Sequence, residues 1–308
     1  MKPAKYKSGR VEKQEARDAK LFLIPCILGL VFLTYLPLLA AFALSLFSWR
    51  IPGTPSFAGL ENYRFLFTED PFFWTSIRVT LQYGFLSVIG SLVYSMAIAL
   101  LLNRPMPGRA VFRTVFYLPF IIPAVATFLS WSLILYGSGI VNNIIAMTGG
   151  RRIQFLSDER TILPALALIA VWTSGNLILI KMAGLGNVPR TYLEAAEIDG
   201  ANAWNRFWRI TMPCMTPIIF YNMLMSLIGN MQAFVPSIFR GNTGSGGGSI
   251  PESYLFMTFT MYRTGFMNGI LGRASAISFV FFIMVGIFTV ILFATSKYWT
   301  FYEGGEPK

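Results

Sequence analysis

The sequence predicts an all-α integral membrane protein with six transmembrane helices. Of its 308 residues, 55% are hydrophobic and only 13% are charged, and the mean hydropathy is +0.57. In a soluble domain about a quarter of the residues are charged. A helix needs about 20 consecutive apolar residues to cross a bilayer. Six stretches meet this requirement, at about 21–47, 79–102, 111–136, 162–184, 214–239 and 274–295.

Six spans place both termini on one side of the membrane, and the distribution of Lys and Arg indicates which side. The polar arm 1–20, the turn around Arg104, the polar segment 191–213 with its flanks and the tail 297–308 together carry 16 Lys and Arg, against 9 on the other side. The positive-inside rule therefore predicts cytoplasmic termini and a cytoplasmic segment 191–213. Between arm and tail, we expect a first helix with its outer loop, 21–76, and a core of five helices, 77–296.

Segment 191–213 (TYLEAAEIDGANAWNRFWRITMP) is too polar to lie in lipid, and it predicts two short helices. Thr191 and Glu194 have the spacing of a capping box at a helix start. Gly200 stands where the first helix would end, because glycine accepts the left-handed conformation there. The second helix is predicted to end at Pro213. Its aromatic face would be formed by Trp204, Phe207 and Trp208.

Composition excludes several kinds of site. The chain has no histidine, which rules out His-based acid–base catalysis and His metal ligands, and no metal site is predicted. The phosphate-binding pattern G-x-x-x-x-G-K-[ST] is absent, so the chain is expected not to hydrolyse ATP by that route. The net charge of +11 fits the cytoplasmic excess of Lys and Arg in a membrane protein, and no nucleic-acid partner is expected. Cys26 and Cys214 lie near predicted cytoplasmic ends of spans, where a disulfide is not expected.

The predicted spans contain no Asp or Glu. Ion-coupled carriers usually place ionisable groups within the membrane, so this absence argues against a secondary transporter. Lys181 is the one charged residue close to the interior of a span. We expect it to extend to the cytoplasmic interface, as long basic side chains do near helix ends. A functional role for Lys181 is the alternative.

Uncharged polar residues inside the spans are candidates for contact with a neutral solute. Ser226, Gly229 and Asn230 lie at i, i+3 and i+4, and hence on one helix face. A second group lies on the fourth span and consists of Trp172, Thr173 and Asn176. Residues of these types also mediate helix–helix packing in membranes, and spacing alone leaves both interpretations open.

Segment 191–213 also carries a resemblance to a known family. Glu194-Ala195-Ala196, with Gly200, Ile210 and Pro213 at fixed spacing after it, resembles the EAA loop of ABC-importer permeases. Met212 departs from the leucine that is more common there. Further stretches resemble the sugar-permease branch, of the maltose and glycerol-phosphate type and its first permease subunit: FRTVFYLPFIIPAV, GIVNNI, AGLGNVPRTYLEAAEIDGA and GRASAISFVFF. The resemblance implies the type I ABC-importer permease fold.

The resemblance also implies site residues. In this family the EAA loop docks on an ATPase, which implies coupling roles for Glu194, Ala195, Ala196, Asp199, Gly200 and Arg206. Alignment on the loop glutamate implies a solute pathway lined by Phe120, Ala124, Trp172, Thr173, Asn176, Ser226, Gly229 and Asn230. Two departures concern the outer gate: Val235 stands where Asp is common, and GNTGSGGGS replaces T-x-G-G-P.

The function implied is ATP-driven, binding-protein-dependent import of a mono- or oligosaccharide through the cell membrane of a bacterium or archaeon. The implied partners are a second homologous permease, forming a heterodimer, two ATPase subunits, an extracytoplasmic sugar-binding protein and membrane lipid. This chain would bind no cofactor and would not be an enzyme, because ATP and Mg would be bound by the partner ATPase. The alternatives are a non-sugar solute such as a glycerol phosphate, or a passive channel.

Overall fold

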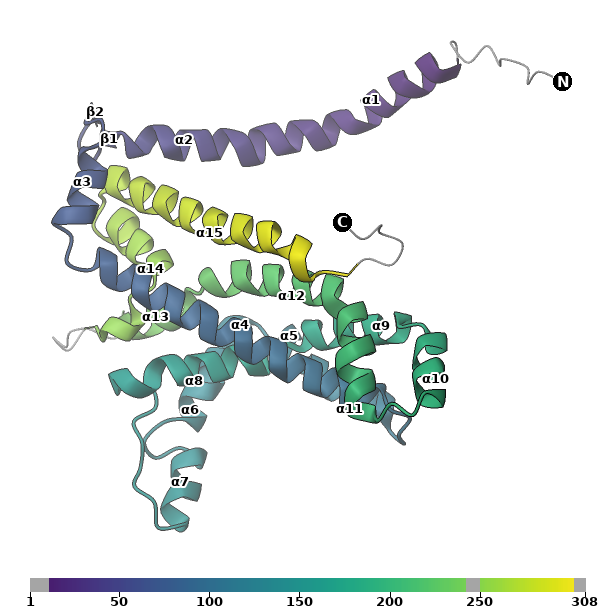
Figure 1. The fold of residues 1–308 in the computed structure, drawn as a ribbon. Helices are drawn as coiled ribbons and strands as arrows, with labels where there is room; N and C mark the ends of the chain where they lie inside the picture. The colour runs from purple at the N-terminus through teal and green to yellow at the C-terminus, as the bar shows by residue number, and fades with distance from the viewer. Residues whose placement is uncertain (1–10, 242–249, 302–308) are drawn as a thin grey trace.

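The structure, a computed structural model, describes residues 11–241 and 250–301. This part of the chain is almost entirely helical (Figure 1). Its only sheet is an antiparallel hairpin of two short strands, β1 (Phe47–Ser48) and β2 (Ser56–Phe57). Four helices are long and apolar enough to cross a membrane, and six spans result if two bent helix pairs each count as one. The predicted class, all-α with six spans, is confirmed.

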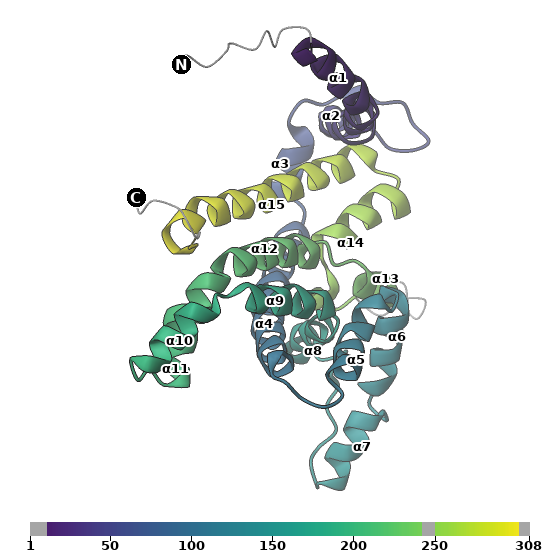
Figure 2. The same cartoon turned by 90° about the vertical axis from the view of Figure 1, so that its right-hand side faces the viewer.

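The first span begins earlier than predicted. α1 (Val11–Leu30) starts inside the expected polar arm and continues through a π-helical turn, Val31–Tyr35, into α2 (Leu36–Ser45). α2 packs on the last helix, and α1 extends beyond the bundle (Figures 1 and 2). Most of its apolar side chains, such as Phe22 at 84% exposed, are left uncovered by the described part of the chain. They therefore form a surface suited to lipid or to another subunit.

α4 (Phe73–Asn103) is the central helix of the bundle. After the short α3 (Glu61–Thr68), it packs against α8, α9 and α12, and Figure 2 shows these helices around it. Its buried positions include the small polar residues Ser76, Ser87, Ser91 and Ser95. Small side chains let neighbouring helices approach closely in a membrane, so this sequence suits a helix enclosed on several sides.

The third and fourth spans, predicted from hydropathy as single apolar stretches, are broken helices. α5 (Arg109–Ile121) and α6 (Ala124–Ile134) meet at 101°, and α8 (Glu159–Trp172) and α9 (Gly175–Asn187) meet at 50°. At the first break Ile122 is extended, as expected for a residue before proline. At the second, a Cβ on Gly175 would lie 2.6 Å from the Phe116 carbonyl oxygen, so α9 starts in close contact with α5. α7 (Ile140–Met147) lies in the predicted outer loop and protrudes from the bundle.

The polar segment forms a helical hairpin. α10 (Arg190–Ile198) is followed by α11 (Ala203–Arg206), a π-helical turn (Phe207–Thr211) and α12 (Met212–Met231). The prediction that Pro213 ends the second helix was wrong, because the helix is continuous from Ala203 to Met231. Pro213 lies in the first turn of α12, directly after the π-helical turn. There the wider turn accommodates a residue that lacks a backbone N–H.

The remaining elements are α13 (Val235–Gly241), a 3-10 turn (Glu252–Tyr254), α14 (Met257–Tyr262), a π-helical turn (Arg263–Met267) and α15 (Leu271–Trp299). Most of the GNTGSGGGS run lies outside the described residues. The start of α1 and the end of α15 lie on the same side of the bundle as α10 and α11 (Figure 1). This arrangement agrees with an even number of spans, and the assignment of that side to the cytoplasm stays a prediction.

Candidate functional site

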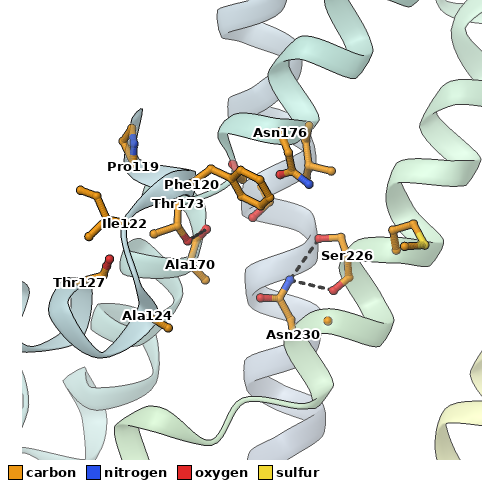
Figure 3. A pocket seen from close by; sticks show the side chains of 15 residues that line it. Pro119, Phe120, Ile122, Ala124, Thr127, Ala170, Thr173, Asn176, Ser226 and Asn230 are labelled. Atoms are coloured by element: carbon orange, nitrogen blue, oxygen red, sulfur yellow. Dashed lines mark hydrogen bonds between the residues drawn. The ribbon is translucent and has the colours of Figure 1, made fainter. Parts of the chain in front are cut away.

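An open cavity of about 430 Å³, with polar and apolar groups in its wall, lies among α4, the α5–α6 pair, the α8–α9 pair and α12. Figure 3 shows Ser226 and Asn230 on α12 lying opposite Phe120 and Thr173. Both helix breaks contribute to its wall, because an interrupted helix turns side chains and backbone groups inward. The cavity is lined by Ser91, Pro119, Phe120, Ile122, Ala124, Thr127, Ala170, Thr173, Ser174, Asn176, Leu177, Met225, Ser226, Gly229 and Asn230.

The structure brings the predicted pathway residues together around this cavity, with one exception. Phe120, Ala124, Thr173, Asn176, Ser226, Gly229 and Asn230 all line it. Trp172 does not, because it is the last residue of α8 and its ring packs edge-on against Trp131, with centroids 5.5 Å apart. Whether these residues contact a solute stays a prediction.

The cavity wall offers hydrogen-bonding groups and no charge. Asn230 Nδ2 donates to the Ser226 carbonyl oxygen at 2.9 Å and to Ser226 Oγ at 3.1 Å (Figure 3). Among the described residues, none bonds to the Asn176 amide, and the buried Thr127 hydroxyl also has no partner there. Polar groups beside an aromatic ring, here Phe120, suit a polyhydroxyl solute, which needs hydrogen bonds and an apolar face.

A second cavity of about 300 Å³ adjoins the first and extends it away from the hairpin. The two share Ala124, Thr127, Ala170, Thr173, Gly229 and Asn230. Phe234, Val235 and Pro236, at the junction of α12 and α13, line the second cavity. Val235 therefore lies at the end of the second cavity that is farther from the hairpin. This is the residue that departs from the family pattern.

The hairpin α10–α11 turns at Gly200, whose φ is +77°, so the predicted left-handed conformation is confirmed. The predicted capping box is wrong: α10 begins at Arg190, directly after Pro189, and no side chain caps it. Thr191 therefore lies inside the first turn, where its hydroxyl is not at the capping position. The second helix has a cap that was not predicted, in which Asn202 Oδ1 accepts from the Asn205 N–H at 2.8 Å.

An ion pair joins the two helices of the hairpin, with Arg206 Nη1 2.8 Å from Glu197 Oε2. Apart from this pair, the hairpin is largely open. Glu194, Ala195, Asp199 and Gly200 are exposed, while Ala196 and Arg206 are half-buried. Large apolar side chains are exposed beside them, with Ile198 at 87%, Trp204 at 68% and Trp208 at 48%. Contact of these residues with an ATPase stays a prediction.

Comparison with known proteins identifies the family. Residues 91–298 match the model of the family described as binding-protein-dependent transport system inner membrane component. The chain belongs to this family. It is 37% identical over 289 residues to the probable ABC transporter permease protein YesP of Bacillus subtilis, covering 92% of each chain. It is 29% identical to the trehalose/maltose transport system permease protein MalF of Thermococcus litoralis, covering 94% of this chain and 97% of that one.

Among solved structures, the chain is similar to one from a bacterial ABC transporter involved in the import of the acidic polysaccharide alginate. The TM-score is 0.77 at 22% identity, covering 94% of this chain and 98% of that one. The same transporter was also solved in complex with an alginate pentasaccharide-bound periplasmic protein. This likeness shows that the chain has the type I permease fold. The family region, 91–298, contains the α10–α11 hairpin and most of the residues around both cavities.

In this inner membrane component one predicted side-chain position was wrong. Lys181 does not extend to an interface: it lies on α9 with 0% of its surface exposed. Its Nζ donates to the Leu92 carbonyl oxygen at 2.8 Å and to Ser95 Oγ at 2.6 Å, both on α4. The acceptors are more than eighty residues away in sequence, so the local pattern around Lys181 gave no sign of them.

Proposed function

We propose that this chain is the transmembrane permease subunit of an ATP-driven, binding-protein-dependent carbohydrate importer. The family is that of inner membrane transport components. One relative is named for trehalose and maltose, and the structural neighbour belongs to an alginate importer. The uncharged polar cavity supports the same class of solute. It offers amide and hydroxyl groups together with an aromatic ring, which is the chemistry that sugars require.

The proposed assembly contains a second homologous permease, two ATPase subunits that bind ATP and Mg, and an extracytoplasmic sugar-binding protein in the cell membrane of a bacterium or archaeon. The complex of the structural neighbour with a periplasmic protein supports the last partner. The exposed Trp204 and Ile198 on the hairpin support an ATPase contact on the cytoplasmic side, because clustered exposed apolar side chains mark interaction surfaces. In this assembly the chain itself is not catalytic.

One observation carries the proposal: both ends of the hairpin lead directly into helices that line the cavity. α9, which carries Asn176, runs into α10 with only Val188 and Pro189 between them. α11 is continuous with α12, which carries Ser226 and Asn230. At 1.5 Å per residue, Ala203 lies roughly 35 Å along this helix from Ser226. A displacement of the hairpin by an ATPase would therefore reach the cavity wall through rigid helices, and alternating access would follow.

The angle of the hairpin depends on Gly200, and this allows a test. Gly200→Val puts a β-branched residue at φ +77°, where nothing lies within 4 Å of the new Cβ. The expected defect therefore comes from the backbone, at about 1–3 kcal/mol of local strain, which would change the angle between α10 and α11. We expect ATP-dependent uptake by the reconstituted assembly, measured with a sugar that stimulates its ATP hydrolysis, to fall at least tenfold, with membrane insertion retained.

Gly149→Val is the matched control, because Gly149 has φ +79° and open space around it but lies after α7, away from the hairpin. It should carry the same local strain and keep uptake. Normal uptake by Gly200→Val would contradict the coupling role. Downhill flux of sugar through this chain alone, without nucleotide, would instead support the passive channel.

A further inference from the structure

A positive charge without a counter-charge is buried inside the bundle. Lys181 Nζ bonds to two uncharged acceptors, the Leu92 carbonyl oxygen and Ser95 Oγ. α9 and the helices that pack against it, α4, α5 and α12, contain no Asp or Glu. An ammonium group has three N–H donors, so one remains beyond these two bonds. Burial of an uncompensated charge is costly, and an ionisable residue at membrane depth usually marks a solute or ion pathway.

Lys181 lies one helical turn from the cavity, on the side of the hairpin. On α9, Leu177 lines the cavity and Lys181 follows it by four residues, in the direction of α10. On α4, Ser91 lines the cavity and Ser95, which accepts from Lys181, follows it by four residues. One turn is about 5.4 Å. Two helices therefore place the ammonium group directly beyond the cavity wall.

Asn222 on α12 occupies the same level. It precedes the cavity residue Ser226 by four residues, again in the direction of the hairpin. It is 0% exposed, and neither Nδ2 nor Oδ1 has a hydrogen-bond partner among the described residues. A buried amide without partners is destabilising. Both α4 and α9 pack against α12. A Cβ on Gly184, three residues from Lys181, would clash with Cδ1 of Ile218. Ile218 lies four residues from Asn222, so a layer with unused hydrogen-bonding capacity adjoins the cavity.

We propose that Lys181 and Asn222 form an anion subsite that takes the carboxylate or phosphate of an otherwise polyhydroxyl solute as it moves from the cavity toward the hairpin. The inference rests on the proposed function and narrows its substrate to acidic saccharides or sugar phosphates. The ammonium and amide N–H groups would donate charge-assisted hydrogen bonds to the anion. The uncharged cavity would hold the sugar rings, while Lys181 supplies a positive potential that favours anions.

The potential can be measured with thiol reagents of opposite charge. Met225 lines the cavity, is 49% exposed, and lies three residues from Asn222. In the complete assembly, with Cys26 and Cys214 replaced by Ser, Met225→Cys is treated with an anionic sulfonatoethyl or a cationic trimethylammonioethyl methanethiosulfonate. Relative to a free thiol, the anionic reagent should react at least tenfold faster than the cationic one, because a nearby positive charge attracts the first reagent and repels the second.

Lys181→Met should remove this preference, and Lys181→Arg should keep it. A ratio of the two reaction rates near one, measured with Lys181 present, would overturn the proposal. An unchanged ratio in Lys181→Met would also overturn it, because Lys181 would then only link α9 to α4 by hydrogen bonds. The comparison of the two reagents in the protein that retains Lys181 needs no substitution at this residue, so it remains valid even if Lys181→Met fails to assemble. The thiol-modification rates do not depend on transport, so a failure of the proposed import function would be detected separately, in uptake assays.

Protection of the same cysteine identifies the anionic group. The probes are a uronic-acid disaccharide, its counterpart with each carboxylate reduced to a hydroxymethyl group, and a disaccharide phosphate. Stronger protection by an anionic probe than by the neutral one, with the difference lost in Lys181→Met, supports the subsite. The probe that slows modification of the cysteine then shows whether the subsite binds a carboxylate, a phosphate or both. Equal protection by neutral and anionic probes, or protection by none of the three, overturns the proposal.

Discussion

The two ends of the helix bundle are held together in different ways. At the end away from the hairpin, residues 250–258 run through the interior and bond to three other parts of the chain. At the opposite end, α10 has no buried residue at all. The first end is completed by contacts within this chain, whereas the second presents its side chains to the surroundings.

The contacts of residues 250–258 are specific and buried. Tyr254, Leu255, Phe256 and Met257 are each at most 1% exposed. The Met257 N–H donates to Thr80 Oγ1 on α4 at 3.0 Å, Tyr254 donates from its hydroxyl to the Leu156 carbonyl oxygen at 3.0 Å, and Thr258 donates to the Ala233 carbonyl oxygen at 2.5 Å. These bonds connect α4, the loop before α8, and the end of α12.

The difference between the two ends of the bundle indicates that the hairpin end is the one that needs a partner subunit. A segment with satisfied hydrogen bonds and an apolar core is stable by itself. A hairpin with exposed tryptophans and one ion pair gains little from its own contacts and has surface left for another subunit. We therefore expect substitutions at the first end to change stability, and substitutions at the second to change coupling.

The largest effect on stability is expected from Phe256→Ala. Phe256 is fully buried, and its ring packs edge-on against Tyr83, with centroids 5.1 Å apart. Truncation of a buried aromatic residue leaves a cavity and lowers the free energy of unfolding by about 3–5 kcal/mol. Unfolding in detergent, followed by circular dichroism over a denaturant series, would measure this loss.

Trp204→Ala is the matched change at the hairpin. Because Trp204 is 68% exposed, we expect the free energy of unfolding to change by no more than about 0.5 kcal/mol. Co-purification with the ATPase subunits should nevertheless be lost. Equal destabilisation by the two substitutions would remove the contrast between the two ends.

A smaller effect is expected from Thr80→Val. The side chain keeps its shape, but the Met257 N–H at the start of α14 loses its acceptor in a fully buried place. An unsatisfied buried donor costs about 1–3 kcal/mol, which should appear as a lower free energy of unfolding in the same denaturant series. Thr80→Ser keeps the hydroxyl and should recover most of the loss. A wild-type value for Thr80→Val would mean that the N–H finds another partner.

The sequence was sufficient for features that depend on local chemistry. Hydropathy predicted the six spans, and Gly200 predicted a left-handed turn because glycine favours that conformation. The resemblance, aligned on Glu194, named residues that the structure places around one cavity. Each of these predictions needed only short-range patterns or a fixed spacing.

The features that were wrong depend on contacts between distant parts of the chain. The burial of Lys181 requires acceptors on α4, and no pattern near residue 181 contains them. The resemblance implied Trp172 as a pathway residue, and the structure packs its ring on Trp131, outside the cavity lining; its contact with a solute stays a prediction. Pro213 was expected to end a helix, yet a π-helical turn before it accommodates the missing N–H. In each case tertiary geometry outweighed the local signal.

The smallest effect on stability is expected at two similar ion pairs. Arg78 and Glu252 lie 3.0 Å apart with side chains 59% and 62% exposed, and Arg206 and Glu197 lie 2.8 Å apart with side chains 27% and 69% exposed. Exposed pairs contribute about 0.2–1 kcal/mol, because solvent screens them. Glu252→Gln and Glu197→Gln should therefore leave the denaturant midpoint nearly unchanged.

The two substitutions should differ in sugar uptake driven by ATP. Glu252 links residues 250–258 to α4, and several other hydrogen bonds already hold this segment in place. Uptake should therefore persist in Glu252→Gln. The Glu197 ion pair joins α10 to α11 across Gly200, so Glu197→Gln frees the hairpin angle and should lower uptake several-fold at an unchanged denaturant midpoint. Parallel uptake assays in proteoliposomes would measure this. Equal uptake by both variants would show that this ion pair does not set the angle, and the contrast would then rest on the exposed tryptophans alone.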